Sequence, residues 1–472
     1  PLTADVPEVA LFFDDAPDIK LWIRWYKLSG ENPSPHWFDK LIRRGTPPLA
    51  IIGGETSDRA LYQARGLESV RGQWPGPAPV YCISTATADR YDPRDYQSGE
   101  LPYLTWPKLM EVYDKRTFRF CFPNTRMVEA VLDFVHQNPQ VCAQRLTDPQ
   151  VGAAAVAQAS PYGALAILSA AGHFQPYYPS TLIWKDDGYS KDLGEIFLKV
   201  FADEARPKGG PFADFYNNYI HYSVGDFLEP NPQEADAVGL FLAHNPRFRD
   251  QPQLMALPTA AQRARRFLRT LCRRAPAEIR NVVVVTGDAV GFNNIYRDRD
   301  LAWNILDMPV SLVFFSHRNP IDAAAGFGQQ DATGLINNTG TQDVLLHRDI
   351  VEAVVQAAFD KGRLVADADR FLDRLGHTRW RKGRIHNDLV DADSPPAVPF
   401  FDGAGNRRAD TGEHIIWLKP VFEGNRNLPE AFVSVWRASG ERPERNWRTI
   451  ALPLHILYDR PTREENHGHG GD

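Results

Sequence analysis

The sequence predicts an α/β protein with two lobes, each a mostly parallel sheet flanked by helices, followed by a β-rich C-terminal region. Three observations carry this prediction. Short apolar runs recur along the chain with apolar residues at consecutive positions, which is typical of parallel strands buried on both faces. Each run ends in a polar or glycine-rich turn, and a helical pattern commonly follows it. The series starts again near residue 180, which indicates a second sheet.

The first lobe is predicted from four apolar runs. Strands are expected at Val9–Phe13, Pro48–Ile52, Val80–Ser84 and Phe118–Phe122. A helix with apolar residues at helical spacing is expected over Met127–Val135.

The second lobe is predicted from the same pattern. Strands are expected at Ser180–Trp184, Asn281–Val285 and Val310–Phe315, and a helix over Leu193–Val200. A further strand is expected at Ile220–Gly225, in a stretch that is long for such a fold.

The last third of the chain changes in character. A helix is expected over Asp343–Lys361, and the segment Trp380–Arg460, rich in proline, glycine and aromatic residues, indicates irregular β-structure.

These elements divide the chain into four segments. The first part of lobe 1 is expected at 1–123, lobe 2 with insertions at 124–330, a helical return to lobe 1 at 331–366, and the β-rich part with a polar tail at 367–472.

Composition narrows the class of protein. The chain has 472 residues, 53 basic and 59 acidic side chains and a net charge of -6. A nucleic-acid-binding domain is usually basic, so no nucleic-acid partner is expected. No apolar run reaches the ~20 residues of a membrane-spanning helix. No signal segment follows Pro1, which leaves either a removed targeting segment or an excised piece of a longer protein.

Four cysteines are widely scattered: Cys82, Cys121, Cys142 and Cys272. They lack metal-ligand spacing. Free buried thiols and one or two disulfides both remain open.

Five motifs occur in a recognisable order. A strand ends in a glycine-rich turn with serine at Ala50–Ser57, and the next ends in serine and an Ala-Thr pair at Ile83–Thr87. A Phe-Arg-x-x-Pro-like segment, Phe118–Asn124, opens a helix. Trp184–Ser190 joins a strand to acidic residues and a Tyr-Ser turn, and Phe400–Arg407 has the form Phe-Asp-x-x-Gly-x-Arg.

In these motifs the chain resembles the type I periplasmic solute-binding proteins, the branched-chain amino-acid binders and related receptor ligand-binding regions. The resemblance implies two lobes that close around a small solute, without catalysis or a cofactor. It implies an amino acid or related carboxylate as ligand, a membrane permease or receptor as partner, and an extracytoplasmic or periplasmic location. In the family, a first strand near the middle of the first sheet and a helix after it would precede the strand expected at Val9–Phe13. Neither is recognisable in this sequence.

The resemblance also implies a ligand site. Ser57 and Thr87 would donate hydroxyls and Ala86 its backbone to a carboxylate, and Tyr189 would lie over the ligand. Asp288, after a strongly apolar strand, could pair with a ligand ammonium group. Structural alternatives remain for each side chain. They are helix capping for Ser57 and Thr87, a partly buried tyrosine in a turn for Tyr189, and turn formation for Asp288.

Other polar residues have two interpretations each. Arg318 could hold an anionic ligand or form a surface ion pair, and Asp186 and Asp187 are expected to be solvated turn residues. Asp14 and Asp15 could bind a metal but fit a turn equally well. Six arginines within 263–274 indicate a helix with a solvated basic face and an apolar core stripe, the alternative being a surface for an anionic partner.

Signals of catalysis are weak. Tyr222–Gly225 has the form of half a nucleophile elbow around Ser223, but His221 replaces its first glycine. The leading function is therefore solute binding for transport or sensing. The alternative is a degenerate domain of the same fold that acts as a signalling or protein-interaction scaffold without a small ligand.

Overall fold

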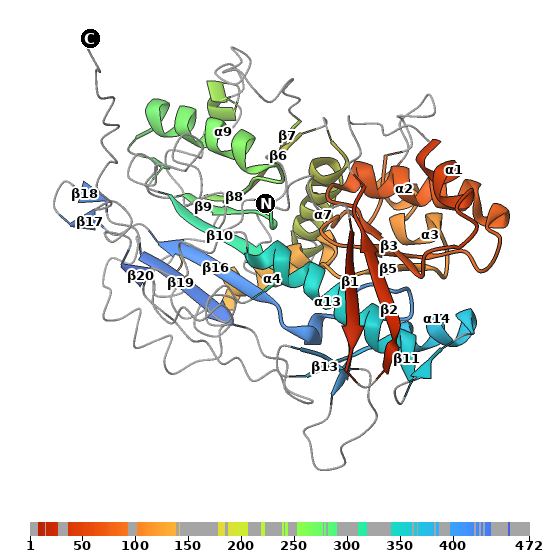
Figure 1. Cartoon of the computed structure of the whole chain (residues 1–472). Helices are drawn as coiled ribbons and strands as arrows, with labels where there is room; N and C mark the ends of the chain where they lie inside the picture. The colour runs from red at the N-terminus through yellow and green to blue at the C-terminus, as the bar shows by residue number, and fades with distance from the viewer. Residues whose placement is uncertain are drawn as a thin grey trace, which may run out of the picture.

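The structure is a computed structural model of the whole chain (Figure 1). It describes residues 8–14, 16–26, 36–92, 102–137, 141, 178–184, 187–205, 219–221, 238–239, 241–243, 253–276, 278–279, 282–289, 310–318, 341–360, 363–365, 367–381, 384–386, 397–419, 422–423, 426–427, 430–435 and 452–453.

The chain opens with a hairpin rather than with a strand of the first parallel sheet. Strand β1 (Glu8–Phe13) pairs antiparallel with β2 (Ala16–Arg24) in a sheet of their own. The expectation that Val9–Phe13 is a strand of the first lobe's parallel sheet is therefore wrong. The hairpin leaves Phe12 and Trp22 more than half exposed, which a central strand buried on both faces would not do.

The first parallel sheet has three strands in the order β3 (Ala50–Gly53), β4 (Val80–Ile83) and β5 (Thr117–Arg119). All four residues of β4 are buried, as expected for a central strand covered on both faces.

Helices cover both faces of this sheet. One core joins Tyr81 and Ile83 to α1 (His36–Ile42), α2 (Ser57–Ser69) and α3 (Leu109–Val112). The other joins Val80, Cys82 and Phe118 to α13 (Thr341–Ala358) and α14 (Ala368–Gly376). The three strands and these five helices are called the small-sheet unit below.

The second sheet has eight strands in the order β20-β19-β16-β10-β9-β8-β6-β7. Its parallel part consists of β6 (Tyr178–Ile183), β7 (Tyr219–His221), β8 (Gln253–Ala256), β9 (Val282–Val285) and β10 (Ser311–Ser316). Strands β16 (His414–Lys419), β19 (Glu430–Val435) and β20 (Leu452–Pro453) extend it in antiparallel pairing.

Two helices pack together on one face of this sheet. Apolar residues of α4 (Asn124–Gln137) and α7 (Gly188–Ala205) share a core with strand residues such as Leu254, Val283 and Val313. Helix α9 (Ala261–Arg274) packs through Phe267 against Trp184. The eight-stranded sheet with α4, α7 and α9 is called the large-sheet unit. In Figure 1 it lies to the left, with the small-sheet unit to the right.

Short elements complete the described chain. They are η1 (Arg71–Gln73), η3 (Tyr103–Thr105), β11 (Phe359–Asp360), β12 (Arg363–Leu364), β13 (Arg379–Arg381), β14 (Arg384–His386), β15 (Val398–Pro399), η8 (Ala409–Thr411), β17 (Phe422–Glu423) and β18 (Arg426–Asn427).

The predicted fold class is confirmed, since two parallel sheets flanked by helices and a β-rich C-terminal region are present. Strand β8 was not expected, and the predicted strand at Ile220–Gly225 is described only as β7, up to His221. The C-terminal region is less irregular than expected, because β16 and β19 join the large sheet instead of forming a separate part.

Candidate functional site

The two units meet where their parallel strands end. The turns after β4 and β5 in the small sheet face those after β9 and β10 in the large sheet. A hydrogen bond of 3.1 Å from Phe122 N–H to His317 Nδ1 links the two groups of turns directly. The carboxyl end of a parallel sheet is where ligands bind in open α/β folds. All five predicted site residues lie in these turns or at the start of the helix that follows a strand.

Ser57 and its neighbours lie on the small-sheet side. Ser57 is buried, and its Oγ accepts a hydrogen bond of 3.3 Å from Ala88 N–H. The N-cap of α2 is Thr56, whose Oγ1 accepts from Arg59 N–H at 3.3 Å. The capping interpretation of Ser57 is therefore wrong, and its hydroxyl instead helps to hold the turn after β4.

Ala86 and Thr87 lie in that turn and are almost fully buried. The Ala86 carbonyl accepts from Cys121 Sγ at 3.3 Å, and the Thr87 carbonyl accepts from Asn124 N–H at 2.8 Å. The Thr87 hydroxyl is buried and forms no hydrogen bond with the described residues. It does not cap a helix in the described part of the chain.

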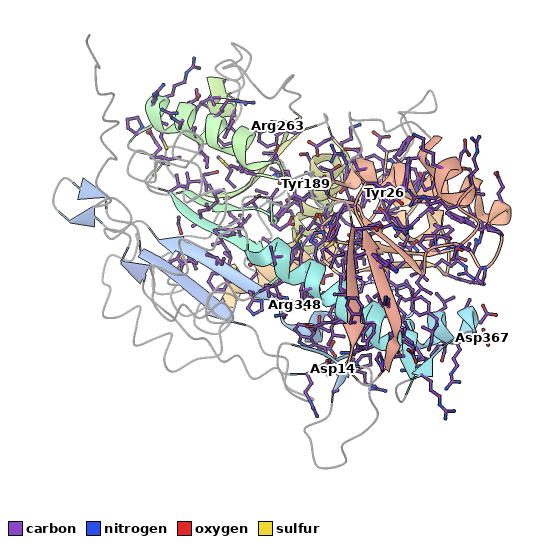
Figure 2. The ribbon with its side chains drawn as sticks, viewed as in Figure 1. Asp14, Tyr26, Tyr189, Arg263, Arg348 and Asp367 are labelled. Atoms are coloured by element: carbon purple, nitrogen blue, oxygen red, sulfur yellow. The ribbon has the colours of Figure 1, made fainter. Side chains whose placement is uncertain are left out.

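Tyr189 and Asp288 come together on the large-sheet side. The Tyr189 hydroxyl accepts from Ala289 N–H at 3.2 Å. Burial, and after it the charge of Asp288, raises the pKa of Tyr189 well above its ordinary value. A Cβ added to Gly287 would lie 2.5 Å from the Tyr189 hydroxyl oxygen, so glycine is required for Tyr189 to reach this strand end. Figure 2 places Tyr189 where the two units meet.

His317 orients Asp288. Its Nε2 lies 2.9 Å from Asp288 Oδ2, while its Nδ1 faces the Phe122 N–H. Because a backbone N–H can only donate, Nδ1 must be the acceptor and Nε2 must carry the proton that it gives to Asp288. The ring also stacks on Phe122 with an interplanar angle of 11°. Asp288 is thereby held with one oxygen engaged, and His317 joins the site although the sequence did not single it out.

Three buried polar atoms of this region have no hydrogen-bond partner among the described residues: Thr87 Oγ1, Asn124 Oδ1 and Asp288 Oδ1. Leaving such a group unpaired costs about 1–3 kcal/mol each, more for a charged oxygen. Buried polar groups are normally paired, so each of these three unpaired atoms needs a physical reason. One donor hydroxyl and two acceptor oxygens offer partners to a small polar molecule.

Cys121 lies between these groups but does not provide a nucleophile. Burial raises the pKa of its thiol to about 12, and Asp288 contributes in the same direction. A nucleophilic cysteine requires a lowered pKa and a base within reach. His317 has both ring nitrogens engaged elsewhere. Ser223 lies outside the described residues.

Arg407 connects the two units from the C-terminal region. It is 2% exposed, and its Nη1 donates to Phe120 O at 3.2 Å and to His317 O at 3.1 Å. Its Nε and Nη2 donate to Thr411 Oγ1 and Thr411 O. The guanidinium lies 4.1 Å from the centre of the Phe122 ring. The Phe-Asp-x-x-Gly-x-Arg motif thus ends in a side chain that joins the residue after β5 of the small sheet to the residue after β10 of the large sheet.

Other sequence-based interpretations are corrected. Arg318 is 6% exposed and pairs with Asp349 of α13, so it forms a buried ion pair rather than a ligand contact or a surface pair. Asp187 is a turn residue but not a freely solvated one, because it accepts from Ser190 N–H at 2.7 Å and from Arg263 Nη1 at 2.6 Å. Arg263 (Figure 2) is therefore buried rather than part of a basic face.

The solvated basic face of α9 is confirmed at its end, where Arg273 and Arg274 are exposed. Cys82, Cys121 and Cys272 are free and buried, and Cys142 lies outside the described residues. No group of three or more potential metal ligands occurs among the described residues. Asp15 and Asp186 are outside them as well. No described helix is long and apolar enough to cross a membrane.

No protein-family model matches the chain, and no curated protein sequence matches it. Solved structures are similar to it at low identity. A leucine-binding protein from Thermotoga maritima shares 12% identity with a TM-score of 0.45, over 86% of this chain and 85% of that one. A solute-binding protein of an ABC transporter from Rhodopseudomonas palustris BisB5, in complex with 3,4-dihydroxybenzoic acid, shares 12% identity with a TM-score of 0.47, over 84% and 81%.

A leucine-, isoleucine-, valine-, threonine- and alanine-binding protein from Brucella ovis, in a closed conformation, shares 10% identity with a TM-score of 0.46, over 85% of this chain and 81% of that one. These are proteins of the kind that the sequence motifs resemble.

Proposed function

We propose that the protein binds a small polar solute where the two units meet, for transport or sensing and without chemical conversion. The observation that carries the proposal is that Thr87 Oγ1, Asn124 Oδ1 and Asp288 Oδ1, which belong to the turns where the two units meet, are buried without a hydrogen-bond partner among the described residues. A bound solute supplies the missing partners and so recovers the hydrogen bonds that these atoms lack.

The solute class follows from the donors and acceptors. Thr87 donates a hydroxyl to a carboxylate, in a turn also built by Ser57 and Ala86. Asp288 offers its second oxygen to an ammonium group, and the Tyr189 ring lies beside it. An amino acid carries both groups, and a hydroxylated carboxylate presents one carboxylate and one hydroxyl. The partner in this proposal is a membrane permease or receptor in an extracytoplasmic compartment.

The test is thermal unfolding against a panel of amino acids, hydroxybenzoates, small dicarboxylates and nucleotides. A solute at a hundred times its Kd stabilises the protein by about 2.7 kcal/mol, which is readily measured. We expect stabilisation by one of the first two classes and none by nucleotides.

Substituting Thr87→Val tests the site itself. Valine has the shape of threonine but lacks the hydroxyl. Because an unpaired buried hydroxyl is removed, the free energy of unfolding of the solute-free variant should equal or slightly exceed that of the unchanged protein. The solute-induced stabilisation should be lost. The matched control is Thr117→Val. Thr117 is the first residue of β5, at the end of the strand away from the turns where the two units meet, and its buried hydroxyl donates to Tyr113 O at 2.8 Å. That variant should be less stable by about 1 kcal/mol and respond to the solute as the unchanged protein does.

The proposal is wrong if no compound of the panel stabilises the protein, or if Thr87→Val keeps the full response. The first result would favour the interaction-scaffold alternative. One observation supports that alternative: Phe12, Trp22, Trp25 and Tyr26 of the N-terminal hairpin and the residues after it are exposed. Clustered exposed apolar side chains commonly mark interaction surfaces.

A further inference from the structure

Asp192 is a buried carboxylate that four hydrogen-bond donors surround. It is fully buried, on the second turn of α7. Its Oδ1 accepts from Arg90 N–H at 2.9 Å and from the Tyr103 hydroxyl at 2.9 Å. Its Oδ2 accepts from Asp89 N–H at 2.8 Å and from Asn124 Nδ2 at 2.8 Å.

These contacts join the two units. Helix α7 belongs to the large-sheet unit, where Leu193 and Ile196 pack in the core next to Asp192. Asp89 and Arg90 follow β4 of the small sheet, and Tyr103 precedes α3 of the same unit. One side chain of the large-sheet unit is therefore inserted into a ring of donors that is mostly built by the small-sheet unit. If the units separate, all of the bonds from the small-sheet unit break together.

We propose that Asp192 is a pH-sensitive latch that holds the two units closed, and that uptake of a proton by its carboxyl group tightens the closure. This goes beyond solute binding and does not depend on it.

The charges around Asp192 favour proton uptake in the closed state. All four donors to it are neutral groups, and the nearby anion is Asp89, the residue whose backbone N–H it holds. The Asp89 carboxylate accepts from Thr125 N–H at 2.7 Å and lies 3.5 Å from Arg119 Nη1. The Arg90 guanidinium is directed elsewhere, toward Trp106 O.

The remaining charge next to Asp192 on α7 is Lys191, which pairs with Asp92 at 3.7 Å. Burial, and after it the charge of Asp89, raises the pKa of Asp192 to about 7.

The groups around Asp192 can also accommodate a protonated carboxyl group. The Tyr103 hydroxyl can rotate so that its oxygen accepts from a protonated Asp192. The protonated carboxyl group is therefore satisfied without rebuilding the interface.

The direction of the pH effect follows from linkage. Separation of the units would expose Asp192 to water and return its pKa to about 3.9, the ordinary value for aspartate. Because the closed state has the higher pKa, it binds more protons between these two values, so closure strengthens as pH falls through 7. Between pH 8 and pH 6 the closed-to-open ratio should rise about tenfold.

Amide hydrogen exchange of the solute-free protein tests the latch directly, because the Asp89 and Arg90 amides are two of its bonds. Their exchange, divided by the intrinsic rate at each pH, should slow about tenfold from pH 8 to pH 6. Asp192→Asn carries an uncharged carboxamide that does not titrate, so the protection of both amides should be independent of pH. Because its Nδ2 can only donate, one of the two amides loses its acceptor and should be less protected. Asp192→Ala removes the latch and should leave both amides weakly protected at every pH. Asp114→Asn, a substitution at an exposed aspartate, should behave as the unchanged protein does.

The latch is refuted if protection of these amides in the unchanged protein does not vary with pH, or if it varies equally in Asp192→Asn. Should Asp192→Ala fail to fold, those two pH series still decide. Because no solute is present, the result is independent of whether the solute panel finds a ligand.

Discussion

At the scale of single residues, Gly405 shows a requirement that the backbone imposes. It occupies the left-handed region at φ +83°, in a turn where Asp402 Oδ1 accepts from Ala404 N–H and Asn406 N–H. Its carbonyl accepts from Arg119 N–H at 2.9 Å, which fixes the turn against β5. A Cβ at this position would lie 2.5 Å from Thr117 O. The turn therefore needs glycine for its backbone conformation and for the close approach to β5.

Substituting Gly405→Ala should destabilise the protein by more than about 2 kcal/mol, since left-handed strain of about 1–2 kcal/mol adds to the contact with Thr117 O. Denaturant unfolding measures it. Gly403→Ala in the same turn is the control, because a Cβ there would meet nothing within 4 Å. Equal effects of the two substitutions would show that the close approach to Thr117 is not a constraint.

At the scale of secondary-structure elements, helix α14 illustrates capping. It begins after Asp367, whose Oδ1 accepts from Asp369 N–H at 2.9 Å and Arg370 N–H at 3.5 Å. Phe371 and Leu375, four positions apart, are its two buried residues and pack against the small-sheet unit. The cap satisfies N–H groups that the first turn of a helix leaves without partners.

Asp367→Ala should therefore cost about 1 kcal/mol of unfolding free energy, while Asp367→Asn, which keeps an oxygen acceptor, should cost only a few tenths. Asp367 lies at the edge of the molecule, away from Tyr189 of the proposed site (Figure 2), so neither variant should change the response to a solute. A loss of equal size in both variants would assign the effect to charge rather than to the cap.

Elements also show where local patterns are insufficient. The apolar runs at β4, β9 and β10 predicted strands correctly because their residues are buried on both faces. The run at β3 also forms a strand, although it lies at the edge of its sheet and is only partly buried. The run at Val9–Phe13 is equally apolar but forms a hairpin with β2. An apolar run predicts a strand but not the strand with which it pairs, because pairing depends on the residues beyond the turn.

At the scale of the whole molecule, Arg407 links the two units through hydrogen bonds to a residue of each. It is a buried cation that forms bonds to Phe120 O, His317 O and both oxygens of Thr411, and burial lowers its pKa to about 9. The planar fork of arginine reaches these acceptors simultaneously, which the single ammonium group of lysine cannot do.

Arg407→Lys should lower the free energy of unfolding by roughly 2–4 kcal/mol, because it leaves buried carbonyls unpaired. Arg408→Lys next to it replaces a more exposed arginine that pairs with Asp410 at 2.9 Å, and should cost less than about 1 kcal/mol. Calorimetry of the two variants distinguishes them. Comparable stability in both would mean that the Arg407 contacts do not hold the units together.

The fold class could be predicted from the sequence, as could most strands of the two parallel sheets and the turns in which Ser57, Thr87, Tyr189 and Asp288 lie. These features are visible as continuous apolar runs and the polar turns after them. A strand that is buried on both faces consists of consecutive apolar residues, so it can be recognised locally.

Local patterns could not predict which of these turns face one another, because that depends on how the two sheets pack. The contact of Phe122 with His317, the insertion of Asp192 between donors about a hundred residues away in the chain, and the reach of Arg407 join distant segments. Such contacts depend on how the two sheets pack and leave no periodic signal in the sequence. For the same reason the unpaired state of Thr87 Oγ1 and Asp288 Oδ1, on which the proposed function rests, emerged only when the surrounding side chains were in place.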